Sequence, residues 1–141
     1  MAVKKRWVVF LVVLCAGLML VSALPLRPMF LSGKLILIET ARTPQQRSRG
    51  LQARSYLNRD QGMLFVFPEE EMPRFWMKNT FIPLDIAFID RQKKIVDMQG
   101  MIPLRTDVLY SPPKKVRYAL EMNSGWFKSN NVKVGDRIFF W

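Results

Sequence analysis

The feature that most restricts the fold of this chain is a series of short apolar runs, separated by turn residues, over residues 33–141. The runs are bounded by Gly, Pro, Asn or clusters of charge, as strands are. They occupy residues 33–39, 63–67, 75–79, 84–90, 95–104, 116–122 and 137–141. Short strands with turn signals about every 8–12 residues are typical of sandwiches and barrels. We therefore predict an all-β domain over residues 33–141, mainly an antiparallel β-sandwich or barrel that is jelly-roll-like.

Other local signals add one or two short helices to this prediction. Thr43 can cap a helix, the proline that follows it suits the first helical position, and Gln46 completes a capping box. This helix is predicted to run to about Arg54. A second helix of one or two turns is predicted within residues 124–131. Gly100 interrupts the fifth apolar run, which predicts a β-bulge at that point.

The N-terminus has the composition of a signal sequence or a membrane anchor. Residues 7–24 carry no charge and follow the basic residues 4–6. A bilayer is spanned by about 17–25 apolar residues, so we predict an apolar helix that is an anchor or a signal over residues 1–24. Prolines in residues 25–32 predict a short spacer after it. The basic start favours an inner-membrane anchor with the body on the extracytoplasmic side, or a periplasmic or secreted protein if the signal is cleaved.

The charge of the chain favours anionic partners. It has 22 Lys and Arg residues against 11 Asp and Glu, a formal net charge of +11. A field of this sign attracts an anionic component of the cell envelope or the membrane surface. The basic residues are scattered rather than aligned, and the predicted export removes the protein from nucleic acid. We therefore expect no nucleic-acid partner.

The residue types that are missing limit the chemistry. The sequence contains no histidine, and its single cysteine, Cys15, lies inside the apolar N-terminal segment. Residues 33–141 therefore lack the commonest general base, the usual zinc ligands and a thiol nucleophile. We expect no cofactor and no metal site, and we favour a non-enzymatic protein.

Polar residues suited to ligand binding gather around residues 74–85. On a strand, Trp76 and Lys78 would share a face, so that a flat apolar surface lies next to a cation. Asn79 lies at a turn, and Asp85 would return on the next strand, opposite Lys78. These residues could hold a small polar ligand. The alternative is a hairpin in which the tryptophan belongs to the core and Lys78 and Asp85 form a surface ion pair.

Several motifs in the chain are specific enough to indicate a family. They are Arg49-Gly-Leu51, Gly62-Met-Leu-Phe-Val-Phe67, Phe75-Trp-Met-Lys-Asn-Thr80, Ile82-Pro-Leu-Asp-Ile86, Phe88-Ile-Asp90, Tyr118-Ala-Leu-Glu121 and Gly135-Asp136. Together they closely resemble the family named domain of unknown function 192. The resemblance implies a compact β-sandwich of jelly-roll type with a small helix, often behind an N-terminal apolar segment. It implies no established activity.

Carrying the motifs over to this chain adds two residues to the candidate ligand-binding set. The full set is Arg49, Trp76, Lys78, Asn79, Asp85 and Glu121. The favoured function is a non-catalytic binding module of the cell envelope for a small polar or glycan-like ligand. The fold-level analogy to glycan-binding jelly rolls supports this choice.

Two alternative functions use other residues. Asp85 and Glu121 are the only strand-embedded carboxyls that we would nominate for a carboxylate-dependent hydrolase, which needs two such groups close together. Methionines could instead bind Cu(I), since thioethers suit this ion. The methionines in or near predicted strands are Met63, Met72, Met77, Met98, Met101 and Met122.

Overall fold

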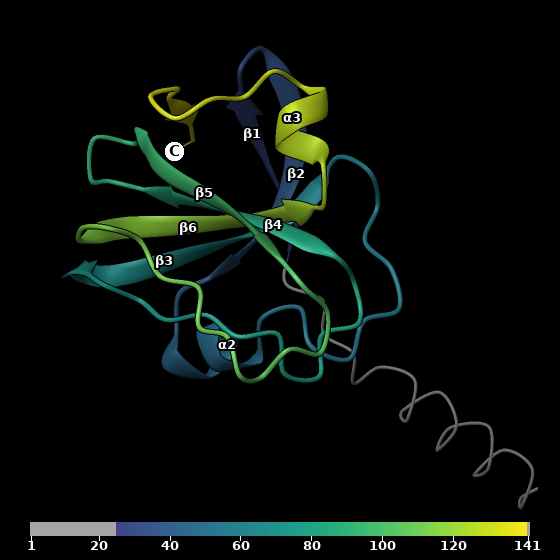
Figure 1. The fold of residues 1–141 in the computed structure, drawn as a ribbon. Coiled ribbons are helices and arrows are strands. Elements are labelled where there is room, and N and C mark those ends of the chain that lie inside the picture. The colour runs from purple at the N-terminus through teal and green to yellow at the C-terminus, as the bar shows by residue number, and fades with distance from the viewer. Residues whose placement is uncertain (1–24, 141) are drawn as a thin grey trace, which may run out of the picture.

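A computed structural model describes residues 25–140 of the chain (Figure 1). The predictions of an apolar helix, a signal and an anchor over residues 1–24 lie outside the described residues. Among residues 25–140, none of the helices has the length and apolar character needed to cross a membrane. The elements are β1 (Arg27–Leu31), β2 (Lys34–Ala41), α2 (Pro44–Arg49), β3 (Gln61–Glu71), β4 (Leu84–Ile89), β5 (Ile95–Met101), β6 (Val116–Asn123), α3 (Trp126–Ser129) and β7 (Ile138–Phe139).

The seven strands form one curved sheet in the order β5-β4-β6-β3-β2-β1-β7. All neighbouring strands are antiparallel except β2 and β3, which are parallel and are joined through α2. The sheet curls so that its ends approach each other: Lys94 forms a bridge with Arg137, and the amide of Ile95 donates to the carbonyl of Asp136. The predicted mainly-β class is confirmed. The arrangement is a half-barrel made from a single sheet over residues 25–140, rather than two stacked sheets.

The structure corrects three local predictions. Strand β1 occupies most of the segment 25–32 that was expected to be a spacer, and it pairs with β2 across a two-residue turn in which both residues have positive φ. Residues 75–79 form a loop with one isolated bridge, Phe75 to Tyr110, instead of a strand. Gly100 pairs regularly with β4, and the irregularity in β5 lies nearer its start, between its pairings with Phe88 and Ile89.

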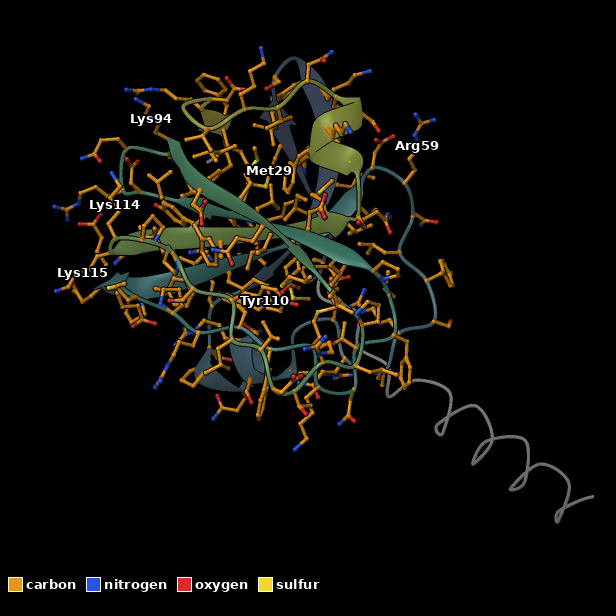
Figure 2. The ribbon with its side chains drawn as sticks, in the orientation of Figure 1. Met29, Arg59, Lys94, Tyr110, Lys114 and Lys115 are labelled. Atoms are coloured by element: carbon orange, nitrogen blue, oxygen red, sulfur yellow. The ribbon has the colours of Figure 1, made fainter. Side chains whose placement is uncertain are left out.

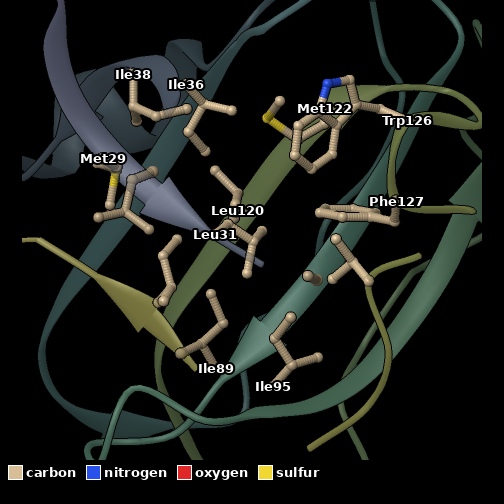
Figure 3. Close-up of a cluster of buried hydrophobic side chains, with 14 residues drawn as sticks. Met29, Leu31, Ile36, Ile38, Ile89, Ile95, Leu120, Met122, Trp126 and Phe127 are labelled. Atoms are coloured by element: carbon tan, nitrogen blue, oxygen red, sulfur yellow. The ribbon is translucent and has the colours of Figure 1, made fainter. Parts of the chain in front are cut away.

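The concave face of the sheet encloses the first of two apolar cores (Figure 3). Alternate residues of the strands point into it, and Trp126 and Phe127 of α3 close its open side. The labelled members in Figure 3 are Met29, Leu31, Ile36, Ile38, Ile89, Ile95, Leu120, Met122, Trp126 and Phe127. Aromatic and aliphatic side chains close this core, and it makes the fold rigid. The candidate site lies on the other, convex face of the sheet.

The second core lies on the convex face and is covered by α2 and by the loops around residues 72–83 and 102–115. Figure 2 places Met29 of the first core above the central strands and Tyr110 of the second core below them. The second core contains Leu51, Met63, Phe65, Phe67, Met77, Ile82, Leu84, Ile86, Phe88, Met101, Tyr110, Val116 and Ala119. Loops cover a sheet less completely than a second sheet does, and the candidate site lies where this cover is incomplete.

Helix α2 starts where the sequence predicts but ends at Arg49, not at about Arg54 as predicted. The Thr43 side chain accepts from the Gln46 amide and the Gln46 side chain accepts from the Thr43 amide, so the capping box is confirmed. The helix stops at Arg49 because Gly50 adopts a φ of 50°. The guanidinium of Arg47 donates to the carbonyl of Val66 at 3.1 Å, which fixes the helix to β3.

Candidate functional site

A pocket of about 260 Å³ opens on the convex face between the end of α2, strands β3 and β6, and the loop at residues 73–80. Its walls combine aromatic rings with arginines, and its lining includes one deeply buried carboxyl group. The lining residues are Arg47, Ser48, Arg49, Gly50, Leu51, Gln52, Phe65, Phe67, Glu71, Pro73, Arg74, Phe75, Trp76, Thr80 and Glu121. A concave apolar site with a few convergent polar groups is the usual form of a small-molecule site.

Glu121 is the buried carboxyl in this pocket, and it is only 5% exposed. Within residues 25–140, no Lys or Arg side chain forms an ion pair with it. Burial, which disfavours the charged form, raises the pKa of Glu121 to about 8. The side chain is therefore mostly a neutral carboxylic acid at pH 7, with one O–H donor and acceptor oxygens.

The strand register explains why this glutamate faces the pocket. Ala119 belongs to the second core and Leu120 to the first, so Glu121 points to the convex face like Ala119. Its neighbour across the strands is Met63, and the next residue along that row is Glu39 on β2. The sheet thus carries two buried glutamates on one face, on either side of a methionine.

The two glutamates differ in their partners. Arg54 binds Glu39 with both ends of its guanidinium, with Nη1 to Oε1 at 2.5 Å and Nη2 to Oε2 at 2.7 Å. Such a two-pronged pair satisfies a buried carboxylate. Within the described part of the chain, Glu121 has no corresponding arginine, and its burial favours the protonated form. A buried carboxyl group without a basic counter-ion, at the wall of a pocket, marks a place where a ligand can bind it.

Arginines give the pocket a positive rim. Arg49 ends α2 and is exposed, and Arg74 is exposed on the opposite loop. Arg47 is partly buried and its guanidinium lies 5.6 Å from the centre of the Phe67 ring. The Arg47 guanidinium already donates to the Val66 carbonyl and stacks on the Phe67 ring. Among the arginines that line the pocket, Arg49 and Arg74 are therefore the ones available to an incoming anion.

Trp76 forms an exposed aromatic wall of the same pocket. Its side chain is 49% exposed, and Lys78 Nζ lies 5.3 Å from the centre of its ring. Behind it, Phe75 packs edge-on against Phe65 with ring centres 5.0 Å apart. The interpretation of Trp76 as a core residue is therefore wrong, and one ring surface is available for stacking next to a cation.

The structure brings three of the six predicted site residues to the pocket: Arg49, Trp76 and Glu121. Lys78 contacts it only through the Trp76 ring. Asn79 has a φ of 52°, and its carbonyl accepts from the Ala53 amide at 2.8 Å, so its backbone shapes the loop.

Asp85 lies on the other face of the sheet and binds the start of α3. Its carboxylate accepts from the Gly125 amide at 2.8 Å and from the Ser124 hydroxyl at 3.2 Å. The expected pairing of Asp85 with Lys78 is absent from residues 25–140, where the ion pairs involve other residues. Asp85 therefore organises the turn between β6 and α3.

We predict that Asp85→Ala lowers the free energy of unfolding by about 2 kcal/mol, because two hydrogen bonds to a charged acceptor are lost. Binding in the Glu121 pocket should be unchanged, since Asp85 does not line it. Chemical denaturation of the full chain measures the first effect, and Glu69→Ala is the control that should change stability little, because this carboxylate is exposed. A fully stable Asp85→Ala protein would contradict this role.

The geometry also disfavours both alternative sites. Asp85 and Glu121 lie on adjacent strands but point to opposite faces, so they do not form the two-carboxyl arrangement of a hydrolase. Met98 packs against the first core and Met101 belongs to the second, so the two most closely spaced methionines are on opposite faces. Within residues 25–140, no group of three or more His, Cys, Asp and Glu residues is arranged to hold a metal ion.

Sequence reasoning did not identify Arg74 or the pair of Glu39 and Arg54. Arg74 directly precedes the Phe75–Thr80 motif, and its position beside an aromatic loop was the available signal. Glu39 closes an apolar strand, which indicates burial of its face. Its partner lies 15 residues away beyond α2, and that pairing depends on the parallel crossover.

Comparisons with known proteins agree with this fold. A UPF0127 protein of Pyrococcus abyssi (strain GE5 / Orsay) is 29% identical over 83 residues, which cover 57% of this chain and 68% of the relative. A UPF0127 protein of Pyrococcus furiosus is 28% identical over 78 residues, which cover 54% of this chain and 65% of the relative. This chain thus spans about two thirds of the length of either archaeal relative.

Two solved structures are similar over most of their length. A protein from Sinorhizobium meliloti 1021, named a "putative transcription regulator", has a TM-score of 0.78 and 33% identity and covers 83% of this chain and 95% of its own. A protein of unknown function from Novosphingobium aromaticivorans DSM 12444 has a TM-score of 0.81 and 29% identity, with 86% and 89% covered. A family model described as DUF192, Uncharacterized ACR, matches residues 29–140. The chain therefore belongs to the DUF192 family, as its motifs predict.

Proposed function

We propose that the protein is a non-catalytic binding module whose pocket takes a small hydroxylated ligand with an acidic group, such as an acidic saccharide unit. The observation that carries this proposal is the buried carboxyl group of Glu121, which forms no ion pair within residues 25–140 and lies in a pocket rimmed by arginines. The proposal keeps the small polar or glycan-like ligand that the sequence favours and assigns it to a defined place.

Each wall of the pocket matches one part of such a ligand. A neutral carboxylic acid both donates and accepts a hydrogen bond, as a sugar hydroxyl does. Arg49 and Arg74 on the rim can bind a carboxylate, and arginine suits this geometry because of its planar fork of donors. Trp76 offers an apolar ring face to the flat side of a saccharide.

The location of the module is a proposal that depends on the sequence alone. The charge-free residues 7–24 after a basic start support an envelope protein held in the membrane or exported. An anionic envelope glycan would then be the natural source of an acidic saccharide. The net charge of +11 supports attraction of such a partner.

Isothermal titration of the full chain with D-glucuronate, D-glucose and propionate tests the proposed ligand class. Glucuronate should bind more tightly than either partial ligand, because only glucuronate engages the arginine rim and the Glu121 carboxyl together. Arg49→Gln should weaken glucuronate binding about 10- to 100-fold, the loss expected for one charged hydrogen bond of about 1.5–3 kcal/mol.

Arg59→Gln is the matched control, since Arg59 is exposed and does not line the pocket. It should leave glucuronate binding unchanged. Binding that is equal for all three compounds, or lost equally in the Arg49 and Arg59 variants, would show that the charge of the whole chain and not this pocket attracts the ligand. Absence of glucuronate binding would overturn the proposed class.

A further inference from the structure

A second surface, distinct from the Glu121 pocket, gathers large apolar side chains on the convex face of β1, β2 and β7. We name it the β1 patch and define it by Phe30, Leu35, Leu37 and Phe139. Their exposed fractions are 45%, 52%, 39% and 62%. None of them lines the pocket at Glu121.

Strand register shows that these side chains are direct neighbours. Phe30 on β1 is paired with Leu35 on β2 and with Phe139 on β7. Leu37 is paired with Pro28, the next pair on the same face of this hairpin. Neighbouring strands are about 4.8 Å apart, so the patch is continuous rather than a set of isolated residues.

The β1 patch is not needed for the fold. The same strands bury their other residues, including Met29, Leu31, Ile36 and Ile38, in the first core. The loops and α2 that cover the convex face over β3, β4 and β6 leave these three strands bare. A contiguous exposed apolar patch on a sheet with one face already buried marks a contact surface.

The position of the β1 patch in the chain indicates what it contacts. Strand β1 starts at Arg27, three residues after the charge-free residues 7–24. Three extended residues span about 10 Å at most. If residues 7–24 lie in a bilayer, as the sequence predicts, β1 is held within that distance of the lipid surface.

The charges around the patch fit an anionic surface. Arg137 is exposed two residues before Phe139. Arg27 and Lys34 are exposed at the two ends of the β1–β2 hairpin, where their register partners Ile38 and Leu31 belong to the first core. The acidic residues nearest in sequence are Glu39, whose carboxylate is bound by Arg54, and Asp136, whose carboxylate accepts from the Ser32 hydroxyl and the Lys133 amide. Exposed aromatic residues with basic neighbours are the composition of surfaces that settle into a lipid interface.

We propose that the β1 patch is a membrane-docking face, which lies on the anionic lipid surface and orients the domain relative to the bilayer. A single tether would leave the domain free to rotate, whereas a tether and an adjacent apolar face together fix its orientation. This inference does not depend on the ligand proposed for the Glu121 pocket.

Spin-label accessibility in the full chain tests the docking face. Cys15→Ala supplies a cysteine-free background, into which Phe139→Cys or Leu109→Cys is introduced and labelled. Leu109 is a matched control: it is 52% exposed and lies in the loop before β6, outside the patch. Both proteins are placed in vesicles of phosphatidylethanolamine and phosphatidylglycerol.

The label at residue 139 should be severalfold less accessible to a water-soluble nickel complex than the label at residue 109, and more accessible to oxygen. Equal accessibility at the two sites in folded proteins would overturn the proposal. So would protection at residue 139 that grows with protein density and brings spin–spin broadening, because it would mean that a second copy covers the patch. Unchanged melting of both variants confirms that they are folded.

Discussion

Replacing Glu121 by Gln should stabilise the protein by about 4 kcal/mol at pH 8, which is an unusually large gain for one substitution. The wild-type side chain is buried and its pKa is raised to about 8, from 4.5 for a free glutamate. At pH 8, release of the proton stabilises the unfolded chain. It stabilises the folded chain far less, because the folded pKa is higher. The glutamine has the same shape and no proton to release.

The sign of the effect follows from the raised pKa. Because the folded pKa is raised, wild-type stability is greatest below about pH 4.5 and is lost as the pH rises through about 8. The advantage of Glu121→Gln should therefore be small at pH 4 and grow with pH. Between these two pKa values, the advantage should grow by about 1.4 kcal/mol for each rise of one in pH.

Denaturant unfolding of the full chain at several pH values between 4 and 9 measures this difference. Glu71→Gln is the control, because Glu71 lines the same pocket but is exposed. It should change the free energy of unfolding by less than about 0.5 kcal/mol, as exposed substitutions usually do. A Glu121→Gln protein that is less stable than wild type at pH 8 would mean that the carboxylate has a partner in the folded protein. A group that lowers stability at the pH where a protein works is expected at a functional site.

Gly62→Ala should destabilise the fold by about 3 kcal/mol or more, because it forces two backbones apart. A Cβ at residue 62 would lie 2.3 Å from the carbonyl oxygen of Glu121 and 2.4 Å from Met122 Sδ. The methionine sulfur can move, but the carbonyl oxygen belongs to the paired strand β6. The strand pair that carries Glu121 would have to separate or shift.

Gly100→Ala is the matched control for Gly62→Ala, since both glycines lie in paired strands. A Cβ at residue 100 would meet only Asp85 Oδ1, at an ordinary contact distance of 3.6 Å. It should change the free energy of unfolding by less than about 1 kcal/mol. Thermal and denaturant unfolding of both variants measure the contrast, and similar stabilities would refute the close approach of β3 to β6.

The sequence predicts β2 to β7 where an apolar run and a turn signal coincide, although the same signals wrongly predict a strand at residues 75–79. Thr43 and Gln46 likewise predict α2 because a capping box is a local interaction. Strand β1 was missed since Pro28 argues against an inner strand. Proline is tolerated there because β7 pairs only with the last two residues of β1. The half-barrel depends on long-range pairing that no local pattern encodes.

The residues of the candidate site likewise fall into two groups: those that a local motif identifies and those whose position depends on the whole fold. Trp76 and Glu121 were identified because aromatic and acidic residues within specific motifs carry a local signal, and both reach the pocket. Asp85 gives an equally strong signal but faces the other side, where it binds the Gly125 amide. Which side chains of β4 lie on the convex face depends on how the whole sheet curls, and the local sequence around Asp85 does not show this. The Glu39–Arg54 pair likewise needs the β2–α2–β3 crossover to form.

The most direct test of the central claim is an NMR titration of Glu121 in the full chain labelled with ¹³C at glutamate side chains. The carboxyl carbon, assigned by comparison with Glu121→Gln, reports the protonation of this one group. We predict an apparent pKa near 8, and a change in this titration when glucuronate fills the pocket. A Glu121 carboxyl that titrates near 4.5 and does not respond to glucuronate would contradict a neutral, ligand-binding glutamate in this pocket.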